Sequence, residues 1–307
     1  MKHNILIVDP IHKSLIFFLK KKKINFTHIP VCNNSILEKK ISKFNILILR
    51  SGVKLDSYII DKGKNLKLVI RAGSGTDNID INYLKKKKIK FFNIPSQNSI
   101  SVAELAIGLT FSVIRKISLC DRLMKGNIWN KHQMSGFELT NKSIGFFGYG
   151  SIAKSIIRLI KPFKNKIYLN VKNFSQIRFK RLKMKKINLL KKKEDIFKLS
   201  DIIFICVPLN KSTNNLINNK LLIHSKKTLV LINISRGGIV NEKDLYTFLK
   251  MKKILGAATD VFKHERKKNK LFELNNLVST CHIGGMTDEA QERISRIIIN
   301  KYLKILN

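Results

Sequence analysis

Three short segments in the C-terminal third of the chain bring together an arginine, a glutamate and a histidine: residues 233–238 (NISRGG), 260–265 (DVFKHE) and 280–285 (TCHIGG). The Arg236 guanidinium could hold a carboxylate through two parallel hydrogen bonds. The His282 imidazole could give or take a proton near neutral pH, and the Glu265 carboxylate could orient it. Side chains of these types suffice for moving a hydride and a proton.

A glycine-rich turn precedes these segments. Residues 144–147 are strand-like, GYGSIA follows at 148–153, and a helical pattern continues over 154–161. In a dinucleotide-binding turn the glycines allow a tight bend and close approach of the backbone to a pyrophosphate, and a third small residue allows tight helix packing. The N-terminus of the next helix then faces the phosphates. We therefore expect a dinucleotide site, with an ordinary strand-to-helix turn as the alternative.

One part of the dinucleotide pattern is missing. An acidic residue for the adenosine ribose is expected about 20 residues after the turn, and Val171 stands there, followed by Lys172. A small neutral residue beside a lysine would tolerate a 2′-phosphate better than an aspartate. NAD is the expected cofactor, and use of NADP(H) is the alternative hypothesis.

Short apolar runs alternate with longer amphipathic segments, which predicts an α/β fold with parallel strands. The expected strands are 5–8, 46–49, 68–70, 144–147, 167–171, 202–207 and 229–234. The expected helices include 14–22, 102–124, 152–161 and 287–306. At 307 residues the chain suits two domains, which we place at 1–97 plus 282–307 and at 98–281, with 98–124 as a linking helix.

The chain is strongly basic, with 60 Lys and Arg against 20 Asp and Glu and a formal charge of +40. Nucleic-acid binding is one interpretation, and codon bias in an AT-rich genome is the other. The lysines are scattered and no aromatic RNA-binding signature accompanies them, so we expect no specific nucleic-acid partner.

The four cysteines, at 32, 120, 206 and 281, have neither CxxC spacing nor a dense disulfide pattern. We expect no metal site and a reducing, cytoplasmic location. The apolar run at 5–8 is too short for a signal peptide, and no run reaches the ~18 apolar residues of a membrane span.

Taken together, these motifs resemble the D-2-hydroxyacid dehydrogenase family, and most of all its D-3-phosphoglycerate dehydrogenases. The landmarks that carry the resemblance lie at 50–54, 71–80, 98–104, 148–153, 207–210 and in the three segments described first. The resemblance implies two Rossmann-like domains, in which a doubly wound parallel-sheet cofactor domain is inserted into a flavodoxin-like substrate domain.

The resemblance also implies residue roles. Arg236 would hold the substrate carboxylate and polarise its carbonyl, His282 would transfer the proton, and Glu265 would pair with His282. The other cofactor-binding positions would be Ser74, Gly148, Gly150, Ser151, Ile152, Val171, Pro208, Ile234, Ser235, Asp260, Gly284 and Gly285, with Arg236 and His282 beside the nicotinamide. The other substrate-binding positions would be Arg50, Ser51, Gly73, Ser74 and Asn98, with Lys54 as a second candidate for a phosphate.

The leading functional hypothesis is oxidation of 3-phosphoglycerate to 3-phosphohydroxypyruvate, in serine synthesis. Glyoxylate, hydroxypyruvate and D-lactate are rival substrates for a small anionic 2-hydroxy-acid or 2-oxo-acid site. A dinucleotide-sensing, corepressor-like binding protein is an alternative of another class, and a basic nucleic-acid binder is a third. The resemblance implies a homodimer, to which residues 98–124 and Trp129 would contribute.

The chain departs from the family pattern at two positions. Arg266 and Cys281 stand where the family often has proline, after the catalytic glutamate and before the catalytic histidine. Because proline fixes φ, we expect both loops to be less rigid. The chain ends at Asn307, which predicts that the C-terminal regulatory domain of longer relatives, and serine feedback through it, are absent.

Overall fold

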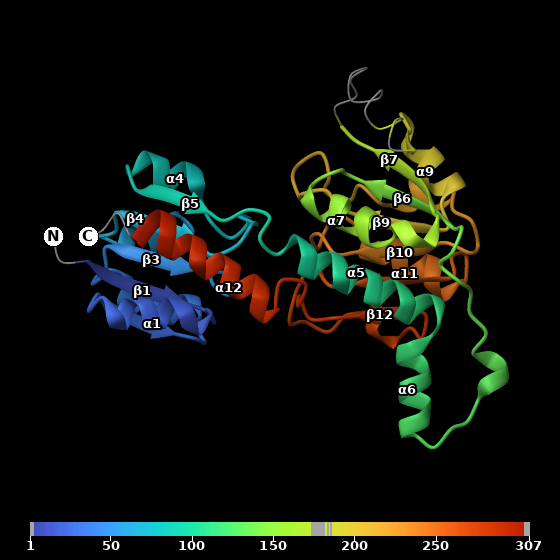
Figure 1. Ribbon diagram of the computed structural model, residues 1–307, viewed down its shortest axis with the longest axis horizontal. Coiled ribbons are helices and arrows are strands. Elements are labelled where there is room, and N and C mark those ends of the chain that lie inside the picture. The colour runs from blue at the N-terminus through green and yellow to red at the C-terminus, as the bar shows by residue number, and fades with distance from the viewer. Residues whose placement is uncertain (1–2, 173–181, 183, 185, 304–307) are drawn as a thin grey trace. The chain divides into compact units, whose positions relative to one another are not determined.

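The computed structural model describes residues 3–172, 182, 184 and 186–303, and they form two compact α/β units (Figure 1). Unit 1 comprises the residues up to Asn98 and those from Gly285 onward, and unit 2 comprises Ser99–Gly284. Unit 2 is thus inserted into the sequence of unit 1. The predicted fold class, with one parallel-sheet unit inserted into another, is confirmed.

Unit 1 contains a five-stranded parallel sheet in the order β2-β1-β3-β4-β5, the strand order of flavodoxin-like folds. The strands are β1 (Asn4–Val8), β2 (Asn25–Ile29), β3 (Ile46–Leu49), β4 (Leu68–Arg71) and β5 (Lys90–Asn93). The helices are α1 (Lys13–Lys21), α2 (Asn34–Ile41), α3 (Ser57–Lys62), α4 (Ile81–Lys86) and α12 (Asp288–Ile297), which is followed by a π-helical turn, Ile298–Leu303.

Both faces of this sheet are buried, which explains the continuous apolar runs. Along β1, Leu6 and Val8 belong to one buried cluster, whereas Ile5 and Ile7 belong to another that includes Ile294 of α12. Successive side chains of a strand point to opposite faces, so a strand covered on both sides must be apolar throughout. The C-terminal helix therefore completes one layer of unit 1.

Unit 2 contains a seven-stranded parallel sheet in the order β12-β11-β10-β9-β6-β7-β8. The strands are β6 (Ser143–Phe147), β7 (Lys166–Asn170), β8 (Ile187–Leu189), β9 (Ile202–Ile205), β10 (Val230–Asn233), β11 (Gly256–Thr259) and β12 (Leu277–Ser279). The α-helices are α5 (Ser99–Ile114), α6 (Ile117–Lys125), α7 (Ser151–Leu159), α9 (Lys193–Leu199), α10 (Asn219–Leu222) and α11 (Glu242–Lys250). Short 3-10 turns occupy Lys131–Gln133, Lys161–Phe163 and Lys270–Glu273.

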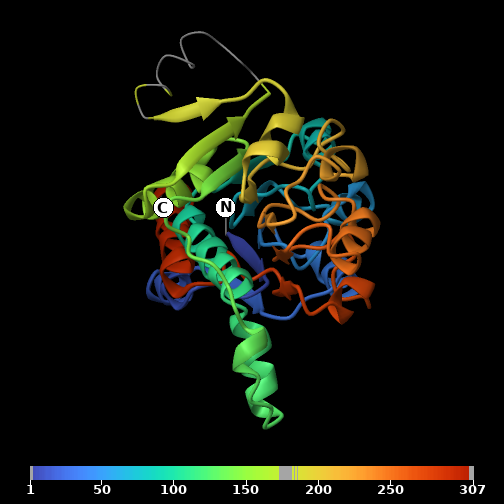
Figure 2. The ribbon, with the colours of Figure 1, turned by 90° about the vertical axis from the view of Figure 1, so that its right-hand side faces the viewer.

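The expectation of one helix over residues 102–124 is wrong. The backbone turns at Lys116, whose φ is +55°, and α6 starts again at Ile117. A left-handed residue cannot continue a right-handed helix, and nothing about a lysine in this position predicts that conformation. Both ribbon views show α6 extending from α5 away from the sheet of unit 2 (Figures 1 and 2).

The structure also moves the boundary that we placed before His282. His282, Ile283 and Gly284 belong to unit 2, and Asn98 belongs to unit 1. The backbone amides of Ile283 and Gly284 donate to the buried carboxylate of Asp260, at 2.8 and 2.9 Å. These bonds tie the histidine loop to the inserted unit.

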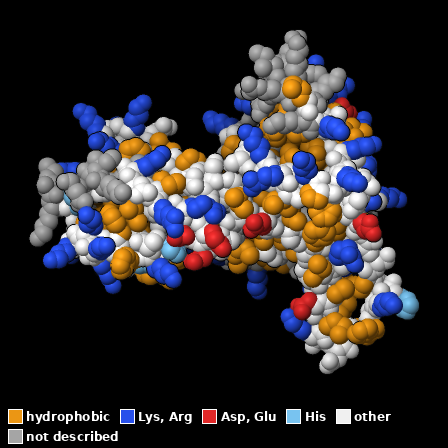
Figure 3. All heavy atoms as spheres, viewed as in Figure 1, with side chains coloured by type: hydrophobic (Ala, Val, Ile, Leu, Met, Phe, Trp, Pro, Cys, Tyr) orange, Lys and Arg blue, Asp and Glu red, His pale blue; other side chains and the backbone are white. Residues whose placement is uncertain are grey.

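The positive charge is dispersed. On the face shown in Figure 3, lysine and arginine side chains are spread over many elements instead of forming one patch. Within the described parts of the chain, no helix combines the length and apolar character that crossing a membrane requires.

Candidate active site

The predicted site residues of unit 2 follow the carboxyl ends of six neighbouring parallel strands. His282 follows β12, Asp260 follows β11, and Arg236 follows β10. Pro208 follows β9, the glycine turn follows β6, and Val171 follows β7. The strand order reverses between β9 and β6, and ligands of such sheets bind at this reversal, outside the carboxyl ends of the strands.

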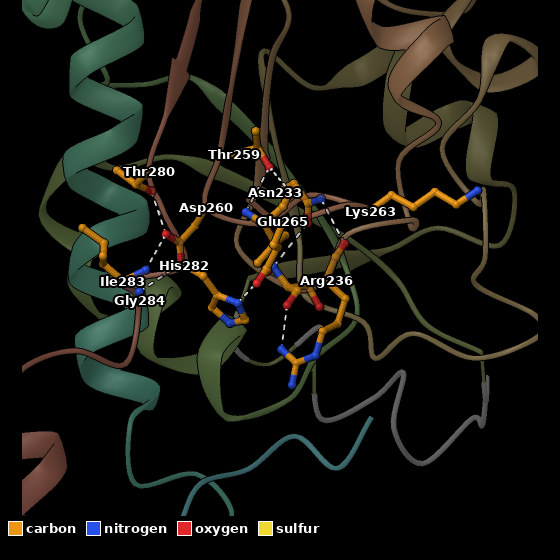
Figure 4. A network of polar contacts seen from close by, with 12 residues as sticks. Asn233, Arg236, Thr259, Asp260, Lys263, Glu265, Thr280, His282, Ile283 and Gly284 are labelled. Carbon is orange, nitrogen blue, oxygen red and sulfur yellow. Dashed lines mark hydrogen bonds and ion pairs between the residues drawn. The ribbon is translucent and has the colours of Figure 1, made fainter. Parts of the chain in front are cut away.

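His282 and Glu265 form a direct pair, with 2.7 Å between Nδ1 of the imidazole and Oε1 of the carboxylate (Figure 4). Both side chains are part-exposed. The hydrogen bond from His282 holds the pKa of the Glu265 carboxyl below its ordinary value, burial opposes this shift, and the charges of His282, Arg236 and Arg266 add to it. The contact occupies Nδ1, so Nε2 is the ring nitrogen left to exchange a proton with a substrate.

Arg236 is held by a turn that begins at the end of β10. The Asn233 carboxamide accepts from the Ser235 amide at 3.2 Å and donates to the Arg236 carbonyl oxygen at 3.2 Å. The Ser235 hydroxyl donates to the Val207 carbonyl oxygen. Because both ends of the turn are bonded, its backbone is fixed before any substrate arrives.

Asp260 organises the loop that carries His282. Its side chain is 2% exposed, and its two oxygens accept from the Thr280 hydroxyl and from the amides of Ile283 and Gly284 (Figure 4). A buried carboxylate needs such donors. Asp260 therefore positions the loop, and its role as a cofactor ligand stays a prediction.

Two residues of the pair's loops have left-handed backbones. The φ angle is +66° at Arg266 and +60° at His282. Such angles are uncommon for residues other than glycine and cost free energy. The expectation that the missing prolines only relax these loops is therefore incomplete, because the ring of proline, which fixes φ near −65°, does not fit the conformation of Arg266.

The glycine turn is tight and leaves the start of α7 uncapped. Gly148 has a φ of +94°, and a Cβ there would lie 2.7 Å from the Cys206 carbonyl oxygen, whereas a Cβ on Gly150 would meet nothing within 4 Å. Gly150 caps the nine-residue helix α7 without any side-chain hydrogen bond, so the first amides of α7, at Ser151 and Ile152, lack a capping side chain. A helix N-terminus whose first amides lack a capping side chain can accept an anionic group.

No carboxylate that could bind a ribose stands at the described end of β7. Val171 is half-buried and Lys172 is exposed. The Asn170 carboxamide donates to the carbonyl oxygens of Leu190 and Lys191, at 3.0 and 3.2 Å, which ties this strand end to the loop after β8. The neighbouring residues with described placement are thus neutral or basic.

In unit 1, Arg50 lies in a loop organised by a buried aspartate. The Asp9 carboxylate accepts from the amides of Arg50 and Gly52, both at 3.0 Å. The Arg50 guanidinium donates to the Pro10 carbonyl oxygen and to the Met286 sulfur. Burial lowers its pKa and Asp9 opposes that shift, while its Nε has no partner among the described residues. The nearby Ser51 is exposed.

Ser74, Asn98 and Gly285, three other predicted residues of unit 1, lie close together. The Ser74 hydroxyl donates to the Asn98 side chain at 3.2 Å, and a Cβ on Gly285 would lie 3.0 Å from Nδ2 of Asn98. Gly73 has a φ of +153°, and a Cβ there would collide with the Arg71 guanidinium. Lys54, by contrast, pairs with Asp56 at 3.7 Å. Within the described ranges, no three His, Cys, Asp or Glu side chains gather as a metal site would require.

Sequence reasoning missed Asp9 and Asn233, which position loops, and it missed Glu242, which accepts from the Lys263 amide and the Asn269 carboxamide. Asp9 and Asn233 stand at the carboxyl ends of β1 and β10, a place that could have marked them. Glu242 is the first residue of α11, and nothing in the sequence distinguishes it from other acidic residues that begin helices.

A sequence profile of the family described as "D-isomer specific 2-hydroxyacid dehydrogenase, NAD binding domain" matches residues 107–284. The chain is 33% identical to a D-3-phosphoglycerate dehydrogenase of Methanocaldococcus jannaschii over 99% of its own length. That alignment covers 57% of the relative, so the chain spans little more than half of it.

A hydroxypyruvate reductase of Thermotoga maritima is also 33% identical, and here the alignment covers 99% of both chains. Among solved structures, the D-lactate dehydrogenase of Aquifex aeolicus, in complex with NAD and lactic acid, superimposes with a TM-score of 0.86 at 25% identity. That match covers 99% of this chain and 95% of the other.

Proposed function

The chain belongs to the D-isomer-specific 2-hydroxyacid dehydrogenase family, and on this premise we propose that it transfers a hydride between a nicotinamide cofactor and a small D-2-hydroxy or 2-oxo acid. The observation that carries the proposal is the 2.7 Å pair of His282 and Glu265 on loops next to that of Arg236. The cofactor, when bound, supplies the hydride.

The residues of this chain supply the rest of the chemistry. Arg236 holds the substrate carboxylate by a two-pronged contact and polarises the neighbouring carbonyl. His282 gives a proton from Nε2 to the carbonyl oxygen in reduction and takes it back in oxidation. Glu265 fixes the ring orientation through Nδ1 and stabilises the protonated imidazole.

The glycine turn and the amides at the start of α7 hold the pyrophosphate in this proposal. NAD is the proposed cofactor, and the pair of Val171 and Lys172 supports NADP(H) as the alternative. Replacing Lys172 with Glu, which restores a carboxylate near the strand end, is expected to weaken NADPH binding ~10-fold or more through like-charge repulsion. Equal NADPH affinity in Lys172→Glu and the wild type would remove the alternative.

We propose 3-phosphoglycerate and 3-phosphohydroxypyruvate as the substrate pair. Arg50 supports the choice, because a partly buried guanidinium in the loop after β3 is a cation of the kind that suits a phosphate. The rival is reduction of hydroxypyruvate, glyoxylate or pyruvate, which need no cation for a phosphate. Similarity to the T. maritima hydroxypyruvate reductase supports this rival.

The decisive experiment is steady-state reduction of phosphohydroxypyruvate, hydroxypyruvate, glyoxylate and pyruvate with NADH and with NADPH. Turnover of at least one acid supports the dehydrogenase proposal. If none is reduced while NADH still binds, the enzyme proposal fails and the corepressor-like alternative is favoured. Salt-sensitive DNA binding without turnover would favour the basic nucleic-acid binder.

Arg50 separates the two kinds of substrate. Arg50→Gln is expected to raise KM for phosphohydroxypyruvate ~10-fold or more and to leave KM for hydroxypyruvate within twofold, because only the first carries a phosphate. Lys64→Gln, at an exposed lysine of unit 1, is the matched control. Equal effects of Arg50→Gln on the two acids would contradict the phosphate role.

We also propose a homodimer in which α6 and the turn after it contact a second copy. No residue of α6 is buried, and Ile117, Met124, Ile128 and Trp129 are 50 to 78% exposed. Unpartnered apolar side chains at this density mark an interface. Trp129→Ser combined with Met124→Ser should shift sedimentation toward the monomer, whereas Phe17→Ser in unit 1 should not. A wild-type monomer at micromolar concentration would refute the dimer.

The cytoplasmic location stays a prediction.

A further inference from the structure

The segment that carries Glu265 is closed at both ends on one carboxylate. Glu242, the first residue of α11, accepts from the Lys263 amide through Oε1 at 2.6 Å and from the Asn269 carboxamide through Oε2 at 2.8 Å. Glu265 lies between these two attachment points. Without them, the segment 263–269 would join β11 to the next 3-10 turn as an exposed loop.

Other contacts restrain both ends of this segment. A Cβ on Gly237 would collide with the Phe262 carbonyl group, so the loop after Arg236 lies directly against the start of the Glu265 segment. The two ends of the segment also meet, because the ring of Phe262 before it contacts that of Phe272 after it edge to face, with centroids 4.9 Å apart. Asn269 also caps the 3-10 turn by accepting from the Leu271 amide. The segment therefore has few alternative paths.

Resting on the proposed dehydrogenase function, the geometry points to Glu242 as a positioning residue that holds Glu265 within hydrogen-bonding distance of His282. By binding both ends of the segment, its two oxygens reduce the number of unrestrained residues and so the conformational entropy of the loop. The left-handed Arg266 lies inside the closed segment, and a strained conformation persists only where its surroundings impose it. Glu242 touches neither His282 nor Arg236, and acts through the loop.

The main test compares two carboxylates of one helix. Glu242→Gln keeps an acceptor for Lys263 but turns an amide nitrogen toward Asn269, so that two donors meet. Asp244→Asn removes the same charge in the same first turn, yet Asp244 accepts from the Asn219 amide, away from Glu265. We expect Glu242→Gln to lower kcat ~10-fold, as typical for a misplaced catalytic group, with NADH affinity unchanged, and Asp244→Asn to stay within twofold.

A double-mutant cycle separates positioning from general structural support. In a Glu265→Gln background, Glu242→Gln should lower kcat less than twofold further, because the geometry that it protects is already lost. Additive losses would overturn the proposal, as would equal losses in Asp244→Asn. Turnover of the best acid of the panel by the wild type is the reference, so absence of wild-type turnover would count against the dehydrogenase function instead.

Asn269→Asp provides a second route should Glu242→Gln fail to fold. It keeps an acceptor for the Leu271 amide but sets two carboxylates against each other at the Glu242 contact. The expected result is again a ~10-fold lower kcat, with a thermal midpoint close to that of Asp244→Asn. A kcat equal to that of the wild type would contradict the role of Glu242.

Discussion

Each unit contains a buried aspartate directly after a strand, and each uses it to hold the loop that follows another strand. Asp9 follows β1 and is 6% exposed, and Asp260 follows β11 and is 2% exposed. In both cases the carboxylate accepts two backbone amides, those of Arg50 and Gly52 or those of Ile283 and Gly284. One device thus shapes a candidate site loop in each sheet.

The two aspartates differ in how they use their oxygens. Oδ2 of Asp9 accepts both amides, whereas Asp260 divides its donors between Oδ1 and Oδ2. The loop in unit 2 is linked further, through His282 and Glu265 to the segment held by Glu242. Unit 2 therefore fixes the His282–Glu265 pair, to which we assign proton transfer, while unit 1 fixes the backbone around one cation, Arg50.

The largest expected effect tests the chemical half of this comparison. His282→Ala and Arg236→Ala should each lower kcat/KM by at least ~100-fold, as typical for loss of a general acid or an electrostatic clamp. Steady-state kinetics on the best acid of the panel measures this loss. His264→Ala, at an exposed histidine of the same segment as Glu265, should stay near wild type. Near-wild-type rates in both catalytic variants would refute the assigned roles.

The two aspartates can be compared by the same substitution. Asp9→Asn can keep its amide oxygen where Oδ2 lies and still accept from both amides. Asp260→Asn must turn an amide nitrogen toward a buried donor, which costs ~1–3 kcal/mol. Hydrogen exchange at the amides of Ile283 and Gly284 should accelerate by roughly 5- to 100-fold in Asp260→Asn. Equal acceleration at Arg50 and Gly52 in Asp9→Asn would show that the oxygens are used alike.

Proline at the two variant positions should act differently. Arg266→Pro conflicts with the φ of +66° at that residue and should lower kcat ~10-fold by displacing Glu265. Cys281 has no left-handed φ, and its amide makes no hydrogen bond with the described residues. Cys281→Pro should therefore stay within about threefold of the wild-type kcat, since only an unbonded amide is lost. Steady-state kinetics compares the two, and the reverse order would contradict the backbone assignment.

The smallest expected effect concerns pH. The folded-state pKa of Glu265 is depressed, so its contribution to stability is present above the unfolded value of about 4.3 and is lost as the pH falls through the lower folded value. The wild type should lose more thermal stability than Glu265→Gln between pH 5 and pH 3 on this basis. Solvent exposure of the pair keeps the difference small. Parallel melting curves at all pH values would argue against the pair.

Most strands that sequence reasoning predicted are runs of large apolar residues, whereas those that it missed lie at a sheet edge or consist of small residues. β1 and β10 read as continuous aliphatic runs, whereas β2 (NFTHI) lies at an edge of its sheet and β11 (GAAT) is made of small residues. Local patterns identify a strand by its apolar side chains. An edge strand, or one packed closely under a helix, lacks that signature.

The candidate site divides in the same way. Arg236, Glu265 and His282 were predicted because side chains of these types suit the proposed chemistry and stand in recognisable segments. Asp9 and Glu242 hold backbone that lies up to 43 residues away in sequence, whereas Asn233 holds the turn only two and three residues further on. The distant contacts arise from tertiary packing, which no spacing in the sequence encodes. The left-handed φ at Lys116 and Arg266 was unpredictable for the same reason.

The two points where the chain leaves and re-enters unit 1 are neighbours. A Cβ on Gly285 would lie 3.0 Å from the Asn98 side chain, and one on Gly284 would lie 3.3 Å from Val102. The ends of unit 1 at the insertion, and likewise the ends of unit 2, therefore adjoin. A short peptide that links Asn98 to Gly285 would connect the two parts of unit 1 without unit 2. Replacing unit 2 with another domain therefore requires only two connections, which lie close together.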